Sequence, residues 1–172
     1  MDLPLSVLIT RPSAPSQAWF AREAADTVIH SPVLQAEPSQ EGLVLRGMTE
    51  LDLELAYLAL KKRFADARSG NPIVKYIPAE KPLEPYYSAT VDTPEYFLGN
   101  VIGNLNSRRG TILNISDIPG GKRIEAEVPV AECFGYSTAL RRLTRTRGEY
   151  KFEFAGYRPT GWRSNPNPGD VV

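Results

Sequence analysis

Arginines are concentrated in two short segments of the second half of the sequence. Arg108 and Arg109 stand directly before Gly110, where a helix is expected to give way to a strand. Four more arginines follow in a segment, residues 134–148, that has no acidic residue: Arg141, Arg142, Arg145 and Arg147. Guanidinium groups bind phosphates and carboxylates through paired hydrogen bonds, so this pattern suits an anion site and, among anions, a nucleic-acid backbone.

The same arginines also fit a simpler interpretation. Cations at the C-terminal end of a helix suit the helix dipole, and glycine commonly ends the last turn, so the segments could be ordinary solvated helix ends. The 172-residue chain has 20 basic and 20 acidic residues and a formal net charge of zero. No global field therefore attracts nucleic acid, and binding would need a local patch. The residues alone leave both interpretations open.

The sequence offers little for catalysis or for metal binding. It has one histidine, His30, expected at a helix end or on the surface, and one cysteine, Cys133, expected to be a packed thiol. This pair excludes an internal disulfide and a structural zinc site of the usual kind. The phosphate-loop pattern GxxxxGK[ST] is absent, so we expect no bound nucleotide, no metal, no cofactor and no enzymatic activity.

The cysteine count and the lengths of the apolar segments also indicate the cellular compartment. A single cysteine fits the reducing cytoplasm, and we expect the protein to be cytoplasmic. No apolar run approaches the length of a membrane span, so no membrane partner is expected.

Alternating apolar positions predict antiparallel strands in a sheet with one solvent-exposed face. The segment RIEAEVPV places Ile124, Ala126 and Val128 on one side and charged residues on the other. The segments PLSVLIT and YKFEF alternate in the same way.

Four helices alternate with these strands. They are predicted in APSQAWFAREAADTVI, TELDLELAYLALKKRF, TPEYFLGNVIGNL and AECFGYSTALRRLT. Thr49 and Asp52 predict a capping box at the start of the second helix. Thr93 and Pro94 predict the N-cap and the first helical residue of the third.

The order strand, helix, strand, strand, helix, strand occurs twice. The prediction is an α+β fold of two tandem ferredoxin-like split βαβ domains, each with a four-stranded antiparallel sheet and two helices on one face. The expected boundaries are 1–78 and 84–159, with a Pro-rich linker at 79–83 and a flexible tail at 160–172.

This topology makes a prediction about the arginines. We expect strands one and three of each unit to run parallel, so that both helices point the same way and all six arginines converge at one end. Single-stranded RNA bound across the sheet is not expected, because the third strand of the second unit exposes Arg123, Glu125 and Glu127 and no aromatic residue. If RNA is bound, we expect the arginines to recognise its phosphates and its shape.

Several segments resemble a known family. The second copy contains LEP at 83–85, LNSRRG at 105–110, FGY at 134–136 and Arg147-Gly148, and it resembles the C-terminal domain V of translation elongation factor G. The family-motif residues there are Asn106, Ser107, Gly110, Phe134, Gly135 and Tyr136. The first copy resembles domain III of that factor, with GMTELDLE where the family has a motif like GMGELHLE; it keeps Gly47, Met48 and Glu50.

The resemblance implies a function. It implies a ribosome-associated, translation-factor-like protein that binds rRNA near the factor site, where domain V approaches the sarcin–ricin loop and the stalk base. The GTPase, barrel and IV domains of the family are not in the sequence, so no GTPase activity is expected. The rRNA-binding residues would be Arg108, Arg109, Arg141, Arg142, Arg145 and Arg147, and the protein would be a monomer. One departure is Arg145-Thr146, where the family has Gln-Gly.

Two alternatives remain beside this hypothesis. The chain could be a fragment or shortened form of a full-length translational GTPase. It could also be a non-ribosomal protein-interaction module that kept the fold and changed its partner, because a fold does not fix a function.

Overall fold

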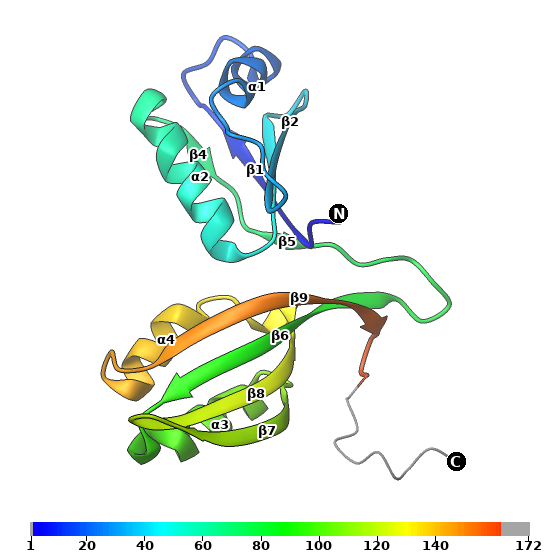
Figure 1. The fold of residues 1–172 in the computed structure, drawn as a ribbon. Helices are drawn as coiled ribbons and strands as arrows, with labels where there is room; N and C mark the ends of the chain where they lie inside the picture. The colour runs from blue at the N-terminus through cyan, green and yellow to red at the C-terminus, as the bar shows by residue number, and fades with distance from the viewer. Residues whose placement is uncertain (1, 163–172) are drawn as a thin grey trace. The chain divides into compact units, whose positions relative to one another are not determined.

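The chain divides into two compact units, Met1–Lys75 and Tyr76–Val172. The computed structural model describes residues 2–162 (Figure 1). Within these residues no helix is long and apolar enough to cross a membrane. Each unit is described by itself.

The first unit is a sheet with two helices. Its elements are β1 (Leu5–Thr10), α1 (Gln17–Ala25), β2 (Leu34–Pro38), β3 (Leu43–Gly47), α2 (Glu50–Arg63), β4 (Arg68–Ser69) and β5 (Ile73–Val74). The strands lie in the order β2-β3-β1-β4, with β5 also paired to β1, and every pairing is antiparallel. The fourth strand of the expected unit is thus split into two short pieces.

The second unit repeats this connectivity with longer strands. Its elements are β6 (Leu83–Thr93), the 3-10 turn η1 (Glu95–Phe97), α3 (Leu98–Ser107), β7 (Thr111–Ile118), β8 (Gly121–Pro129), the 3-10 turn η2 (Val130–Glu132), α4 (Tyr136–Thr144) and β9 (Glu149–Pro159). The sheet order is β7-β8-β6-β9. Figure 1 shows both helices behind the sheet. The prediction of two ferredoxin-like domains is confirmed.

Alternating burial identifies the core face of each sheet. Ile124, Ala126 and Val128 of β8 are all buried, as their spacing predicts. On β9, Tyr150 and Phe152 lie on the same face and contact the ring of Tyr136 on α4, with centroids 5.2 and 5.3 Å apart. The core of the second unit therefore includes an aromatic layer between α4 and the sheet.

Helix α2 begins at a capping box, as predicted. The Thr49 hydroxyl accepts from the Asp52 backbone N–H, and the Asp52 carboxylate accepts from the Thr49 N–H at 2.8 Å. Its core-facing residues are Leu53, Ala56 and Leu60. The other side of the helix also carries leucines that remain about half exposed: Leu51, Leu55 and Leu58.

The start of α3 differs from the prediction. Thr93 is the last residue of β6, and Pro94 has an extended backbone (φ −54°, ψ 142°) rather than a helical one. The Thr93 hydroxyl donates to the Pro94 carbonyl at 3.2 Å and does not cap the helix. The helix therefore begins at Leu98, after one 3-10 turn, and Phe97, Val101 and Leu105 face the core.

The expectation that strands one and three run parallel is wrong. β1 pairs antiparallel with β3, and β6 pairs antiparallel with β8. In this topology each crossover helix joins two parallel strands, and the strand inserted between them runs the other way. Since each helix runs back along the strand that precedes it, α3 and α4 point in opposite directions.

Helix α3 ends in a Schellman motif. The Gly110 N–H donates to the Leu105 carbonyl at 2.9 Å, and the Arg109 N–H donates to the Asn106 carbonyl at 3.1 Å. The left-handed position is Arg109 (φ 57°), not the glycine. Gly110 is needed for space, because a Cβ there would lie 2.7 Å from the Leu105 carbonyl oxygen. This close approach explains the glycine that ends the LNSRRG segment.

Two glycine substitutions in and after α3 test this cap. Gly110→Ala should destabilise the protein by about 2 kcal/mol, because the added methyl overlaps backbone. Gly103→Ala should stabilise it by about 0.5 to 1 kcal/mol, because its Cβ would meet nothing within 4 Å and glycine is a poor helix former. Urea unfolding measures both, and equal effects of the same sign would contradict the cap geometry.

Candidate nucleic-acid interface

Arg108 joins the end of α3 to the start of α4. Its Nη1 donates to the Glu132 carbonyl at 2.6 Å and to the Phe134 carbonyl at 3.1 Å, and its Nε donates to the Asn104 side chain at 3.0 Å. Its guanidinium carbon lies 5.2 Å from the ring centroid of Tyr136. The donors of Arg108 are thus directed at protein acceptors.

Arg109 neutralises a buried carboxylate. Its Nη1 and Nη2 donate to the two oxygens of Glu84 at 3.0 and 3.1 Å, and its Nε donates to Glu132 at 2.9 Å. The Glu84 side chain is 3% exposed. A buried carboxylate without a cation is costly, so this fork holds the beginning of β6 to the end of α3.

The electrostatics of Glu84 are dominated by two opposing effects. Burial raises the pKa of its carboxyl, but the hydrogen bonds and charge of Arg109 outweigh burial and hold that pKa below its ordinary value. The carboxylate therefore stabilises the fold above the pKa of an unfolded glutamate, and this contribution disappears as the pH falls through the lowered pKa. The hydrogen bond from Arg109 to Glu84 in turn raises the pKa of Arg109.

Aromatic residues close over the same end of the unit. The Tyr86 hydroxyl lies 3.2 Å from Glu84 Oε1 and 3.0 Å from the Trp162 carbonyl. Burial and the charge of Glu84 raise the pKa of Tyr86 to about 12. Arg158 lies over the Trp162 ring at 4.3 Å and pairs with Glu127 at 2.8 Å. Of the predicted tail, residues 160–162 therefore include a packed tryptophan, and 163–172 lie outside the described residues.

The other four predicted arginines lie at the end of α4. We call Arg141, Arg142, Arg145 and Arg147 the exposed arginine cluster. All four are exposed, and their side chains make no hydrogen bond or ion pair with any residue that the structure describes. Because nothing in the described chain neutralises them, their guanidinium groups are available to an external anion.

The backbone that presents the cluster is tightly tied. The Thr144 hydroxyl is fully buried, donates to the Leu140 carbonyl at 2.7 Å and accepts from the Gly148 N–H at 2.8 Å. Between these anchors Arg145 (φ 50°) and Thr146 (φ 66°) are both left-handed. A β-branched residue is strained in this conformation. Glycine adopts this conformation without a Cβ clash, so the strain at Thr146 comes from its side chain.

The predicted convergence of six arginines is wrong, because the helices are antiparallel. Arg109 contacts Glu84 at the beginning of β6, whereas Arg147 precedes Glu149, which is paired with Asp92 near the end of β6. Asp92 follows Glu84 by eight positions along β6, so the two groups lie roughly 25 Å apart at opposite ends of the sheet. The arginines form two groups, one with protein partners and one exposed.

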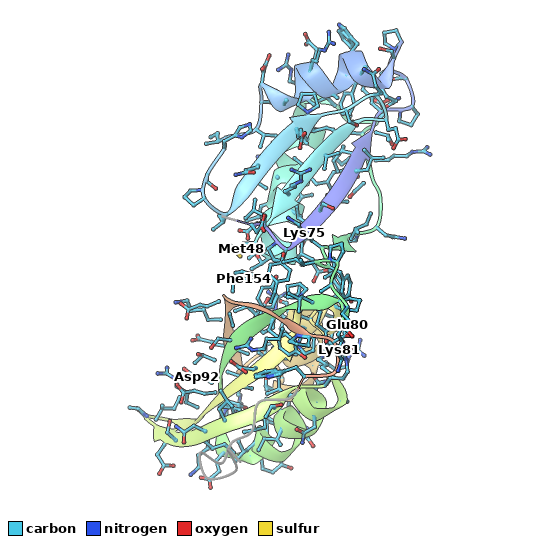
Figure 2. All side chains as sticks on the ribbon, turned by 90° about the vertical axis from the view of Figure 1, so that its right-hand side faces the viewer. Met48, Lys75, Glu80, Lys81, Asp92 and Phe154 are labelled. Carbon is cyan, nitrogen blue, oxygen red and sulfur yellow. The ribbon has the colours of Figure 1, made fainter. Side chains whose placement is uncertain are left out.

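Acidic residues near the cluster are partly neutralised. Asp92, labelled in Figure 2, forms a two-pronged pair with Arg123 at 2.7 Å for each bond. Asp117 is paired with Lys122. Glu149 is exposed directly after the cluster. The positive charge at this end is therefore concentrated on α4 and its turn.

The remaining family-motif residues have structural positions. Gly135 (φ 70°) precedes α4 in a left-handed conformation, and Tyr136 is buried in the aromatic layer. Phe134 is half-buried, and Asn106 and Ser107 are exposed on the last turn of α3.

In the first unit the motif begins at the end of β3. A Cβ on Gly47 would lie 2.9 Å from the Leu53 side chain, and Met48 is buried. Glu50 is the first residue of α2. These positions fix the turn between β3 and α2.

Other candidate chemistry is limited. Within residues 2–162, no group of three or more His, Cys, Asp and Glu side chains could hold a metal ion. His30 is exposed, and Cys133 is buried with its thiol 3.3 Å from the Pro129 carbonyl. Sequence reasoning assigned no role to Glu84 or Trp162. A lone acid within the apolar segment LEPYY was the available signal for Glu84.

Comparison with known proteins shows what the second unit is similar to. Residues 81–163 match the family described as "Elongation factor G C-terminus". The crystal structure of a protein from Thermus thermophilus has a TM-score of 0.65 and 18% sequence identity, over 94% of this chain and 41% of that one. This likeness shows a shared fold, and the chain spans less than half the length of that protein.

Removing the partner of Glu84 tests the role of Arg109. Arg109→Ala should destabilise the protein by about 2 to 4 kcal/mol, because it leaves a buried carboxylate without its cation. The exposed Arg142→Ala is the matched control and should change stability by no more than about 0.5 kcal/mol. Denaturant unfolding of both variants decides the point, and indistinguishable midpoints would show that Arg109 has no structural role.

Substitution of Thr146, which has a strained left-handed backbone, tests the turn after α4. Thr146→Gly should stabilise the protein by about 1 kcal/mol, because glycine adopts a positive φ without a Cβ clash. Thr146→Ala keeps the Cβ and should gain less. Thermal unfolding of the two variants measures the difference, and a lower melting temperature for Thr146→Gly would refute the strain.

Proposed function

We propose that the second unit, whose residues 81–163 match the family described as "Elongation factor G C-terminus", binds ribosomal RNA through the exposed arginine cluster. The observation that carries this proposal is four exposed guanidinium groups, unpaired within the described chain, on one acid-free helix end. Arginine in such a setting binds phosphate oxygens in pairs and releases counterions from RNA. The whole chain has a formal net charge of zero, so a local patch of positive charge has to attract the RNA.

The two arginines of LNSRRG have a different role in this proposal. Arg108 and Arg109 direct their donors at the Glu132 and Phe134 carbonyls and at Glu84, so they position α3 and α4 relative to β6. Arg109 is 42% exposed and could still contact RNA at the opposite end. We assign the main rRNA contact to the α4 end because those guanidinium groups need not first break a protein contact.

The proposed role is binding without catalysis. The sequence has no phosphate loop of the pattern GxxxxGK[ST], and its single histidine and single cysteine lie outside the cluster. We propose that the protein binds the ribosome near the factor site in the cytoplasm, with the first unit acting as a domain III-like partner of the second. It would affect translation by occupying that site rather than by hydrolysing GTP.

A second candidate is a protein-interaction module, and one observation favours it. Leu51, Leu55 and Leu58 form an apolar stripe at i, i+4 and i+7 on the outer side of α2, with exposures of 54, 57 and 50%. Such a stripe fits the apolar face of a partner helix. Under this candidate, Leu55→Glu abolishes capture of a partner protein, and the arginine variants have no effect.

Ribosome binding tests the proposal directly. The variant Arg141→Gln, Arg142→Gln, Arg145→Gln, Arg147→Gln should co-pellet with purified ribosomes much less than the unmodified protein at the same salt concentration. In a salt series, the logarithm of affinity should fall less steeply with the logarithm of salt concentration for this variant. The slope should be smaller by about one unit for each phosphate that the substituted side chains no longer reach, up to about four. Elongation factor G should displace the unmodified protein.

The control removes exposed cations from a different part of the chain. Lys61→Gln with Lys62→Gln removes two exposed cations from α2 of the first unit and should leave binding unchanged. Circular dichroism checks that each variant is folded. If the arginine variant pellets with ribosomes as well as the unmodified protein does, the cluster is not the rRNA contact.

A further inference from the structure

Tyr96 is an aromatic residue held in an exposed position. It is 86% exposed, whereas no other large apolar residue described in the second unit exceeds 44%. Its neighbour Phe97 is buried, and the two rings meet edge to face with centroids 5.1 Å apart at 89°. The buried Phe97 therefore anchors η1, and the Tyr96 ring remains on the outside.

Tyr96 lies at the same end of the unit as the exposed arginine cluster. It follows the last residue of β6 by three positions, and Asp92 of β6 is paired in register with Glu149, directly after the cluster and Gly148. Since α3 and α4 run antiparallel, the N-terminal end of α3 lies beside the C-terminal end of α4. The axes of packed helices are ~8–10 Å apart, so Tyr96 and the exposed arginine cluster are close enough to contact the same RNA.

We propose that Tyr96 stacks on an unpaired base of an RNA whose phosphates lie on the exposed arginine cluster. This inference rests on the proposed function and narrows it to a class of RNA: a loop, bulge or end with a base outside the helix. Bases inside a duplex offer no face to a side chain, whereas splayed bases stack on tyrosine.

The open face of the described sheet does not offer this contact. The third strand, β8, presents Arg123, Glu125 and Glu127 on the open face of the sheet. Leu113 and Ile115 on the edge strand β7 are aliphatic. The carboxylates of Glu95 and Glu149 repel phosphate, so the RNA backbone is expected over α4, with one base turned towards η1.

Two RNA probes and three tyrosine variants test the inference. The probes are a labelled hairpin with an unpaired purine loop and a duplex of the same stem without a loop. Tyr96→Ala should weaken hairpin binding about tenfold or more and leave duplex binding unchanged. Tyr96→Phe keeps the ring and should bind as the unmodified protein does. Tyr76→Ala, at a 44% exposed tyrosine, is the matched control and should have no effect.

A second measurement separates stacking from charge. A fluorescent purine analogue in the loop should change its emission with the unmodified protein and not with Tyr96→Ala. The salt dependence of hairpin binding should be the same for these two proteins, because Tyr96 carries no charge. The four-arginine variant should have reduced affinity for both RNAs.

The outcomes distinguish this inference from the function it rests on. If the arginine variant no longer binds RNA while Tyr96→Ala binds normally, the inference is wrong and the proposed function stands. If Tyr96→Ala weakens hairpin and duplex binding equally, stacking on an unpaired base is also excluded. If the arginine variant binds both RNAs normally, the proposed function and the inference fail together.

Discussion

The antiparallel pairing of β6 with β8 controls the layout of the second unit. These strands are the centre of the sheet, and each helix runs back along the strand before it. Their opposite directions send α3 and α4 opposite ways. The end of α3 therefore meets the start of α4, and the exposed arginine cluster lies beside the start of α3. Which arginines can act together depends on this pairing.

A buried ion pair stabilises one end of this arrangement. Glu84 is almost fully buried, and the Arg109 fork is what makes its charge tolerable there. Arg109 reaches it from a left-handed position that the Schellman motif of α3 creates, and Gly110 makes room for that motif. The LNSRRG segment thus has a structural role. It directs Arg109 towards Glu84 on the sheet, and Arg108 binds the backbone carbonyls of the turn before α4.

The opposite end of the second unit carries the exposed arginine cluster. Thr144 and Gly148 tie down the turn after α4, and the exposed residues between them include Arg145 and Arg147. A rigid backbone that carries unpaired cations gives up little conformational entropy when it binds an anion, which favours binding. The unit therefore separates stability at the Glu84 end from proposed recognition at the α4 end. This separation is why the two groups of arginines should respond differently to substitution.

The amino-acid sequence was sufficient to predict the elements and the fold class. Residue spacing located the helices and strands, the Thr49–Asp52 capping box and the buried faces, because these depend on neighbours within a few positions. Local patterns also located the basic segments.

Which of those segments lie together depends on the packed chain. The pairing of Arg109 with Glu84 joins residues 25 positions apart in the sequence. The contact between Tyr86 and Trp162 joins residues 76 positions apart. No local pattern encodes such contacts. A guanidinium group looks the same in a sequence whether it meets a buried carboxylate or open solvent, and only tertiary packing fixes which it meets.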